Sequence, residues 1–378
     1  MRAIAAVGIV VVGAGLGCAV SACSGGARSD GFPEGPSRGS GGSSGDGSSG
    51  GHTGSGGGGA SGASSGGSTG SGIGDLTGDG GPVESPEAGT FTTVYAHTDS
   101  TLYSVNPSSK VVTEIGVFVG TSDASTDSAI TDLAVDGHGD VYVNTESVVY
   151  RATLPAQNGG NVTLTQVTTI GSSSKFYALA FTPVGALDPA NEILIGGDSD
   201  GNLWSIDTAS GAAVNLGNFG TDPSLSGNTY ELSGDVVFYD GAMNDPTGLA
   251  TIRSCPKGGS GSECKGDFLA SVNMTALKTA YASGTAATSL LGGIYGATSP
   301  TSPGEGTGFA DVFGLGAWDK TVFGFTRHAG MVAPTLITID TTTGAGTRVA
   351  NGFNFSNGWS GAGVTTKVVV SVPPPMVQ

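Results

Sequence analysis

Residues 130–145 read ITDLAVDGHGDVYVNT, and this stretch shows the unit that recurs through the rest of the chain. An apolar run containing Asp132 breaks at a D-G-H-G turn and returns as a second run in which apolar and polar residues alternate. Alternation with a period of two is typical of a half-buried β-strand, and a Gly-containing turn between two such runs predicts a hairpin. Looser copies, each opening with a small or acidic residue, follow downstream.

From residue 91 onward, short β-branched and aromatic runs alternate with turn residues about every 8–12 positions, which predicts an all-β domain. The runs sort into a repeating set of four. Asp207 and Asp340, each followed four residues later by Gly, mark the turn between the third and fourth runs. We expect inner strands at 130–135, 176–181, 233–238, 309–314 and 359–364, and second strands at 93–98, 140–145, 192–197, 248–253 and 321–326. We expect third strands at 101–107, 147–154, 202–208, 267–274 and 335–341, fourth strands such as 110–118 and 212–220, and one short helix near 274–281.

This four-strand repeat resembles the blades of β-propellers over residues 91–370, although it carries no WD40 signature and points to no named repeat subfamily. The first repeat lacks an inner strand, and the last consists of an inner strand alone. Joining the two completes a single five-bladed β-propeller closed by its N- and C-terminal strands, which leaves few open sheet edges. An open β-sandwich is the alternative, and a sixth blade stays open if 281–310 contains further strands.

The chain begins with a leader, residues 1–22, in which Arg2 precedes a long apolar run. The run ends in Val20-Ser21-Ala22-Cys23, which resembles a bacterial lipobox. The resemblance implies that Cys23 is acylated and becomes the mature N-terminus, and Ser24 after it implies a lipid anchor in the outer membrane of the cell envelope. An uncleaved N-terminal anchor is the alternative.

Residues 23–90 are rich in Gly and Ser and almost lack large apolar side chains, so we expect a disordered tether. At about 5–6 Å × √n, such a chain reaches roughly 40–50 Å. Residues 371–378 are expected to form a C-terminal tail beyond the propeller at 91–370.

The composition is acidic: 14 Lys and Arg against 31 Asp and Glu give a net charge of −17. Binding to nucleic acid needs clustered basic residues, so the composition argues against it. Solubility is the simplest interpretation of the acidity. We expect a monomer that meets the membrane through its lipid and a glycan, peptide or protein partner through its loops.

Three aspartates carry the candidate site. Alignment of the inner strands places Asp132, Asp235 and Asp311 at one register, with Ala178 and Gly361 at the matching positions. Such a ring at a channel mouth would favour Ca²⁺, a water cluster or a polyhydroxylated ligand, because close carboxylates raise one another's pKa unless a cation or donor compensates. The alternative is structural: each Asp accepts hydrogen bonds from backbone N–H groups of its own loop.

The remaining candidates are few. Cys255 and Cys264 bracket one loop, which in an exported protein predicts a disulfide. No His spacing indicates a zinc site, and Asp198-Ser-Asp200-Gly-Asn202 is interpreted as a hairpin turn rather than a calcium loop. Long loops on one face carry Tyr230, Tyr295, His328 and Trp359, which are more often packing residues than a sugar platform.

Two functions follow. The first is a lipid-anchored, extracytoplasmic binding module that uses its loop face and needs no cofactor, with Ca²⁺ as an option. The second is an extracytoplasmic glycosidase or lyase that uses the channel-mouth carboxylates. A glycosidase needs two carboxyl groups with separated pKa values. Near-equivalent Asp residues indicate symmetry rather than division of labour, so we favour binding over catalysis.

Overall fold

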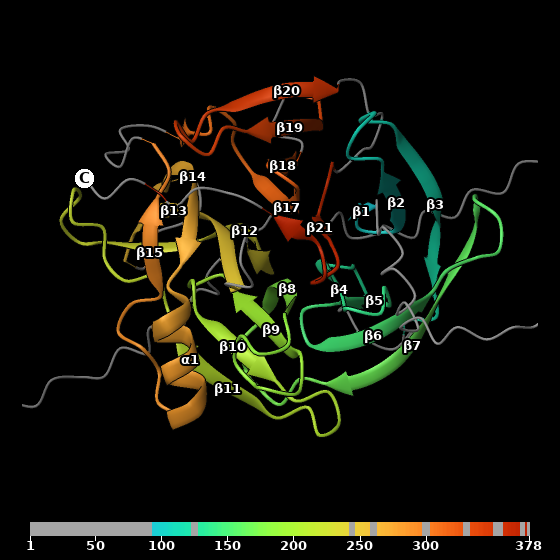
Figure 1. The fold of residues 1–378 in the computed structure, drawn as a ribbon, viewed down its shortest axis with the longest axis horizontal. Helices are drawn as coiled ribbons and strands as arrows, with labels where there is room; N and C mark the ends of the chain where they lie inside the picture. Colours follow the sequence, from blue (N-terminus) through green and yellow to red (C-terminus); the bar gives the residue numbers. More distant parts are fainter. Residues whose placement is uncertain are drawn as a thin grey trace, which may run out of the picture.

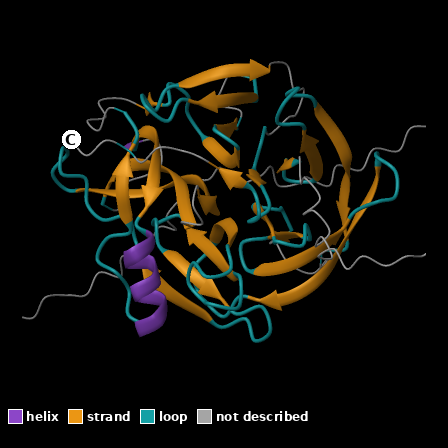
Figure 2. Cartoon of the chain, viewed as in Figure 1, coloured by secondary structure: helices purple, strands orange, loops and turns teal. Residues whose placement is uncertain are grey.

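The computed structural model describes residues 93–121, 128–241, 246–257, 263–296, 303–327, 333–350, 358–370 and 375. These residues form β-strands and a single α-helix (Figure 1, Figure 2), so the predicted all-β class is confirmed. The predictions for the leader, Cys23 and the tether lie outside the described residues. In the described part of the chain, no helix combines the length and hydrophobicity needed to cross a membrane.

The strands follow the predicted repeating order. Nearest the middle of the molecule lie β4 (Asp132–Val135), β8 (Phe176–Thr182), β12 (Asn228–Gly241), β17 (Val312–Trp318) and β21 (Gly361–Gly363) (Figure 1). The second strands are β1 (Val94–His97), β5 (Val141–Asn144), β9 (Ile193–Asp198), β13 (Pro246–Pro256) and β18 (Thr321–Thr326). The third are β2 (Thr101–Val105), β6 (Val148–Thr153), β10 (Leu203–Ile206), β14 (Lys265–Val272) and β19 (Thr335–Ile339). The fourth are β3 (Val112–Val119), β7 (Gly160–Thr169), β11 (Ala213–Gly217), β15 (Leu291–Ile294) and β20 (Gly346–Ala350).

Hydrogen bonding collects these strands into antiparallel groups of four. Two groups are separate four-stranded sheets, and a third is the body of a six-stranded sheet that also includes β16 (Pro303–Gly306) and β22 (Val369–Val370). The remaining two groups make up an eight-stranded sheet. The first group is completed from both ends of the chain, because β21 pairs antiparallel with β1. This terminal pairing is the one that the repeats predict.

The inner strands contact one another around the middle of the molecule. β4 contacts β8, β8 contacts β12, β12 contacts β17, β17 contacts β21, and β21 returns to β4. β4 and β8 are buried at every residue, whereas the outer strand β7 alternates between buried and exposed residues over most of its length. A strand covered on both faces reads as a continuous apolar run, and a strand covered on one face alternates, which explains why both patterns occur in the sequence.

The repeats did not predict one contact between the groups. The outer strands β3 and β7 pair in parallel, with Gly116 opposite Gly160, and this pairing joins two groups into the eight-stranded sheet. A Cβ added at Gly116 would lie 2.0 Å from the carbonyl oxygen of Gly160. Glycine is therefore required at position 116 for the strands to approach this closely.

A C-terminal segment, residues 364–370, crosses the far end of the inner strands. Thr365 forms a parallel bridge with Val135 at the end of β4, and the Asp240 N–H near the end of β12 donates to the Thr366 carbonyl (3.3 Å). β22 then pairs in parallel with the end of β12, and Val370 bridges to Asp319. The segment thus fastens several groups to one another where their inner strands end.

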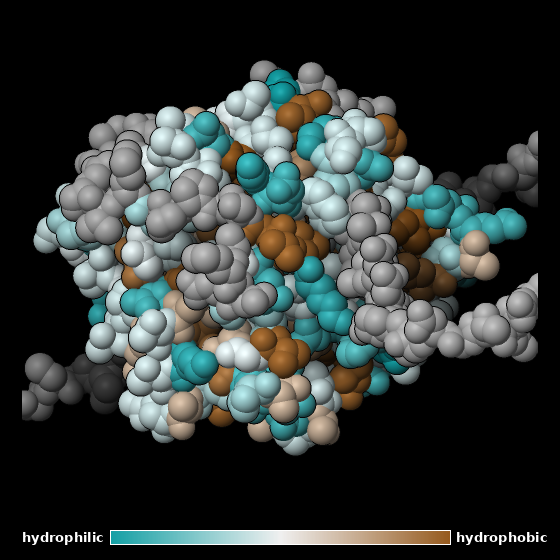
Figure 3. All heavy atoms as spheres, viewed as in Figure 1, coloured by the Kyte–Doolittle hydropathy of each residue, from teal (hydrophilic) through white to brown (hydrophobic). Residues whose placement is uncertain are grey.

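The predicted turns and helix are present. The Asp207 carboxylate accepts hydrogen bonds from the backbone N–H groups of Ala209 and Ser210 (2.9 and 2.7 Å), and Gly211 has the positive φ (74°) that the turn needs. Helix α1 (Met274–Ser283) is capped by Asn273, whose side chain accepts from the Ala276 N–H (3.0 Å). On the face in Figure 3, hydrophobic residues form small separate groups among hydrophilic ones.

Candidate functional site

The structure brings Asp132 and Asp235 together in the interior. Both residues are 0% exposed, and their carboxyl groups are hydrogen-bonded to each other. Each also accepts a backbone N–H from a neighbouring inner strand: Leu179 donates to Asp132 Oδ2 (2.6 Å) and Leu315 donates to Asp235 Oδ2 (2.7 Å). The two aspartates therefore tie β4 to β8 and β12 to β17. This role is close to the structural alternative, except that donors in the next group, Leu179 and Leu315, add to those of the residue's own strand, such as Val236 beside Asp235.

Asp311 does not join them, which corrects the predicted ring of three. The Leu179 N–H donates to Asp132, and the Leu315 N–H donates to Asp235 in the same way, so Leu179 and Leu315 occupy equivalent positions. The residue before Leu315, Gly314, is therefore the counterpart of Ala178, and Asp311 is not. Asp311 precedes β17 and has a positive φ (55°), a backbone conformation outside the strand region. The motif FADVFG matched the other inner strands by its residue types, but the strand begins only at Val312.

Burial decides the charge of the pair. Removing a carboxylate from water penalises its ionised form, so the pKa of Asp132 lies well above its ordinary value and that of Asp235 rises to about 8. A hydrogen bond between two carboxyl groups also requires a proton, which ordinary Asp residues lack at neutral pH. The pair consequently holds at least one proton at pH 7 and is not a site of two negative charges.

His97, on β1, faces the same place. Its Nδ1 donates to the Thr98 carbonyl (2.8 Å), and burial lowers its pKa to about 4, so the ring is neutral with an unprotonated Nε2. This Nε2 lies 3.9 Å from Asp132 Oδ1, and among the described residues neither atom has a hydrogen-bond partner. A Cβ at Gly361 would lie 2.1 Å from Asp132 Oδ1 and 2.5 Å from His97 Nε2. Sequence reasoning missed His97, because nothing in the motif TVYAHT distinguishes it from an ordinary strand residue.

A second set of buried charges surrounds Asp267 on β14. Ser233 donates its hydroxyl to Asp267 Oδ1, and the Asp311 N–H donates to Oδ2 (3.1 Å). Burial raises the pKa of Asp267 to about 8, and the positive charge of Arg253 opposes this shift. Burial likewise raises the pKa of Asp311, with Arg253 and Arg327 opposing. Asp311 thus belongs to a mixed-charge network and not to an acidic ring.

The Asp132–Asp235 pair does not provide the ligands that a calcium site needs. Ca²⁺ takes 6–8 oxygen ligands in proteins, commonly from several carboxylates. Where the structure describes the chain, the groups of three metal-ligating side chains are Glu231 with Cys255 and Cys264, and Asp136 with His138 and Glu192. Neither includes Asp132 or Asp235.

A surface hollow of about 250 Å³ opens where β12 begins. It collects side chains from the β9–β10 turn, from the connection after β11, from the first residues of β12 and from the end of β13. These lining residues are Asp200, Asn202, Asn218, Thr229, Tyr230, Glu231 and Lys257. Two carboxylates, two amides, two hydroxyls and an ammonium group belong to these lining residues, so this polar pocket can exchange several hydrogen bonds with a small polar molecule.

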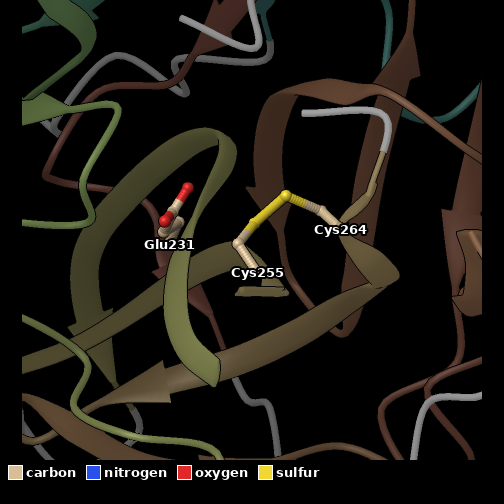
Figure 4. Close-up of side chains that lie close together, drawn as sticks. All are labelled: Glu231, Cys255 and Cys264. Atoms are coloured by element: carbon tan, nitrogen blue, oxygen red, sulfur yellow. A yellow bond between two sulfur atoms is a disulfide. The ribbon is translucent and has the colours of Figure 1, made fainter. Parts of the chain in front are cut away.

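The predicted disulfide between Cys255 and Cys264 is present beside this polar pocket. It fastens the end of β13, which leads into Lys257, to the start of β14, and Glu231 lies close to it (Figure 4). Because both sulfurs are bonded to each other, neither is a thiolate, and thiolates are the form in which Cys binds metal. The Glu231–Cys255–Cys264 group is therefore structural.

The aromatic candidates of the loops are packing residues where the structure describes them. Tyr230, Tyr295 and Trp359 are 2%, 1% and 0% exposed. Trp359 packs edge-on against Tyr103 and Phe325, with ring centroids 5.3 and 5.4 Å apart. His328 lies outside the described residues.

Comparisons with known proteins add little to this picture. No family model and no curated protein matches the chain. Among solved structures, a protein of unknown function from Bacteroides caccae is 7% identical with a TM-score of 0.35, covering 72% of this chain and 97% of that one. A protein from a study of the de novo evolutionary emergence of a symmetrical protein is 13% identical with a TM-score of 0.34, covering 72% and 93%. Virginiamycin B lyase from Staphylococcus aureus is 10% identical with a TM-score of 0.28, covering 71% and 73%. Likenesses at this level carry no argument about function.

Proposed function

We propose that the chain is a five-bladed β-propeller that acts as a lipid-anchored binding module for a hydroxyl-rich ligand of the carbohydrate class. Each blade is one of the antiparallel groups of four strands, beginning with the group of β21, β1, β2 and β3. The circular contacts among the inner strands and the pairing of β21 with β1 support this arrangement. A ring closed in this way leaves few open sheet edges.

The anchor and the location rest on the sequence. Val20-Ser21-Ala22-Cys23 supplies the lipidation site, and residues 23–90 supply the tether that carries the propeller away from the outer membrane. Mass spectrometry of the mature protein should find a lipidated N-terminal Cys23. An intact leader, or a mature N-terminus without lipid, contradicts the anchor without touching the binding proposal.

The burial of Asp132 and Asp235 is the observation that favours binding over catalysis. A glycosidase needs two carboxyl groups that reach the scissile bond, one as acid and the other as base or nucleophile. Here both carboxyl groups are 0% exposed and accept backbone N–H groups of the neighbouring strands. Asp311, the third candidate of the enzyme interpretation, sits among Arg253 and Arg327.

The polar pocket supplies the binding site. Asp200 and Glu231 contribute carboxylate oxygens that accept hydroxyl protons. The Asn202 amide nitrogen donates to Asp198 and the Asn218 oxygen accepts the Gly220 N–H, so Asn202 offers a ligand its oxygen and Asn218 its amide nitrogen. Its volume of about 250 Å³ lies near the lower end of small-molecule pockets, roughly 300–1,000 Å³, which suits one sugar unit rather than a long chain. The disulfide holds the end of β13 next to the pocket, so Lys257 starts from a fixed base.

The test is a glycan array followed by calorimetric titration of its hits. Glu231→Gln and Asp200→Asn remove charge from the pocket while keeping size, and each should weaken binding at least tenfold. Asp188→Asn is the matched control, since Asp188 is half-buried and lies outside the pocket, and it should bind as the wild type does. Binding that survives both pocket substitutions contradicts the site. Release of reducing sugar from polysaccharides by the wild type contradicts the binding-only function.

A further inference from the structure

The structure brings His138 together with two carboxylates from separate segments of the chain. Asp136 and His138 belong to the D-G-H-G turn after β4, and Glu192 directly precedes β9. Ligand atoms of these three side chains lie within 4.8 Å of one another. The cluster sits where β4 ends, whereas the polar pocket sits where β12 begins. Because Thr365 and Thr366 contact the ends of β4 and β12, the two sites are at opposite ends of the inner strands.

Asp136 is held in place with one oxygen unused. Its Oδ1 accepts the backbone N–H groups of His138 (2.8 Å) and Asp140 (2.9 Å), which fixes the turn. The residue is 8% exposed, and among the described residues nothing donates a hydrogen bond to Oδ2, which lies 4.0 Å from His138 Nδ1. Oδ2 can therefore take a further partner. A cation between Oδ2 and His138 Nδ1 would find both atoms already aimed at one place.

Glu192 is fixed by contacts of its own. The Gly137 N–H donates to both carboxylate oxygens (3.0 and 2.9 Å), and the Thr366 hydroxyl donates to Oε1. A carboxylate offers about four lone-pair positions, so Oε2 keeps one for a further partner. Contacts of this kind orient metal-binding carboxylates in known sites. A Cβ at Gly137 would lie 2.8 Å from Oε1, so glycine at this position lets the carboxylate approach the turn.

We propose that Asp136, His138 and Glu192 bind a divalent transition-metal ion, with Zn²⁺ as the best match. Zn²⁺ bonds to imidazole nitrogen and carboxylate oxygen at about 2.0–2.2 Å, so in a tetrahedral site two ligand atoms lie about 3.3–3.6 Å apart. The 4.0 Å between Asp136 Oδ2 and His138 Nδ1 needs a closure of about half an ångström, which a small rotation of the exposed His138 side chain supplies. One nitrogen and two oxygen ligands suit Zn²⁺ better than Ca²⁺, which takes oxygen ligands. Three protein ligands leave a coordination position open to solvent.

The bound ion would link three parts of the ring: the turn after β4, the connection before β9, and through Thr366 the C-terminal segment. Lys367 passes beside Gly137, with its Cε 3.1 Å from the position of a Cβ there, and it is exposed. Its positive charge opposes a cation nearby, so Lys367→Ala should tighten metal binding several-fold. This direction is specific to a cation, because an anion would bind more weakly to the same variant.

The experiment is calorimetric titration of the full chain with ZnCl₂, together with visible absorption spectra of the Co²⁺-loaded protein. We expect one ion per chain and a higher melting temperature in the presence of Zn²⁺, because an ion that binds only the folded state stabilises it. His138→Ala and Glu192→Gln should each lower affinity at least tenfold. The His138 side chain is 81% exposed, so its removal should leave the metal-free melting temperature unchanged.

His52→Ala is the matched control, since it removes a histidine of the chain that is not one of the three ligands. It should bind Zn²⁺ as the wild type does. Absence of stoichiometric binding in the wild type overturns the proposal, and so does binding that persists unchanged in His138→Ala and Glu192→Gln. The glycan titration does not depend on these residues, so either proposal can fail alone.

Discussion

Two sets of aspartates in this molecule accept the same kind of hydrogen bond and respond in opposite ways. Asp340, in an exposed turn between β19 and β20, accepts the N–H groups of Thr342 and Thr343 (both 2.8 Å), and these bonds lower its pKa. Asp235, in the interior, accepts the N–H groups of Val236 and Leu315 (2.6 and 2.7 Å), yet its pKa is raised. The difference is burial, which outweighs the donors at Asp235 and is negligible at Asp340.

Register alone therefore does not reveal the charge of an aspartate. Both residues hold backbone groups in place. At Asp340 an ionised carboxylate holds these groups at a turn that is in contact with water. At Asp235 a carboxyl group that shares a proton with Asp132 holds them between two strands. The interior pair is therefore a structural tie, and its removal should cost far more than removal of the turn aspartate.

The largest effect is expected from Asp235→Ala. This change leaves the buried N–H groups of Val236 and Leu315 without their acceptor, and each unsatisfied group costs about 1–3 kcal/mol. We expect the free energy of unfolding to fall by about 3–5 kcal/mol in urea denaturation. Asp235→Asn, which keeps an acceptor oxygen, should lose clearly less. Equal losses for the two variants would show that the acceptor is not what matters.

A smaller effect is expected from pH. The pKa of Asp235 rises from 3.8 to about 8 on folding, so the stability that protonation confers is complete below pH 3.8 and is lost as the pH rises toward 8. Between pH 6.5 and 8.5 the free energy of unfolding should fall with pH, by at most about 1.4 kcal/mol per pH unit for each proton. His97, whose pKa is lowered from 6.5 to about 4, loses its contribution only as the pH falls below this window.

Urea titrations across this window with wild type and Asp235→Asn provide the measurement. The slope should be shallower in the variant but not zero, because Asp267 also has a pKa raised to about 8. Identical slopes in the two proteins would place the responsible proton elsewhere and break the contrast with Asp340.

The smallest effect is expected from Asp340→Ala. Two hydrogen bonds are lost, but water can replace them at an exposed turn, so we expect a loss of about 0.5–1 kcal/mol in thermal or urea unfolding. Since folding lowers this pKa, its contribution is present above the unfolded pKa and is lost only as the pH falls through the acid range. A loss as large as that of Asp235→Ala would remove the distinction between the two sets.

The pattern of apolar and polar residues predicted much of the fold, and the inner strands show why. FYALAF became β8, which is buried at every residue, and ITDLAV contains β4, because continuous apolar runs fit only strands covered on both faces. FADVFG was placed three residues too early. The backbone of Asp311 turns to positive φ before the strand begins, and residue types alone do not show that conformation.

The candidate sites were predicted less well, because each depends on contacts between distant segments. Asp132 and Asp235 were found through their shared register, but His97 joins them only because β21 draws β1 against β4. The Asp136–His138 turn is evident in the sequence, whereas Glu192 comes from the connection before β9, in another group of strands, and belongs to no motif. Spacing rules detect ligands on one element and do not detect ligands that separate groups of strands bring together.

The pairing of β1 with β21 also sets the order in which the molecule can be completed. β1 is among the first strands of the domain to leave the ribosome, and its partner at residues 361–363 is among the last. Until then one edge of β1 has open N–H and C=O groups, and such an edge can pair with a strand of another chain. Bringing together two segments so far apart in the sequence also costs loop entropy before the contact forms, and this slows folding. The late partner β21 thus competes with strands of other chains for the open edge of β1. The segment ahead of β1 is rich in Gly, which has a low preference for β-strands, so it offers this edge no sequence that would pair with it first.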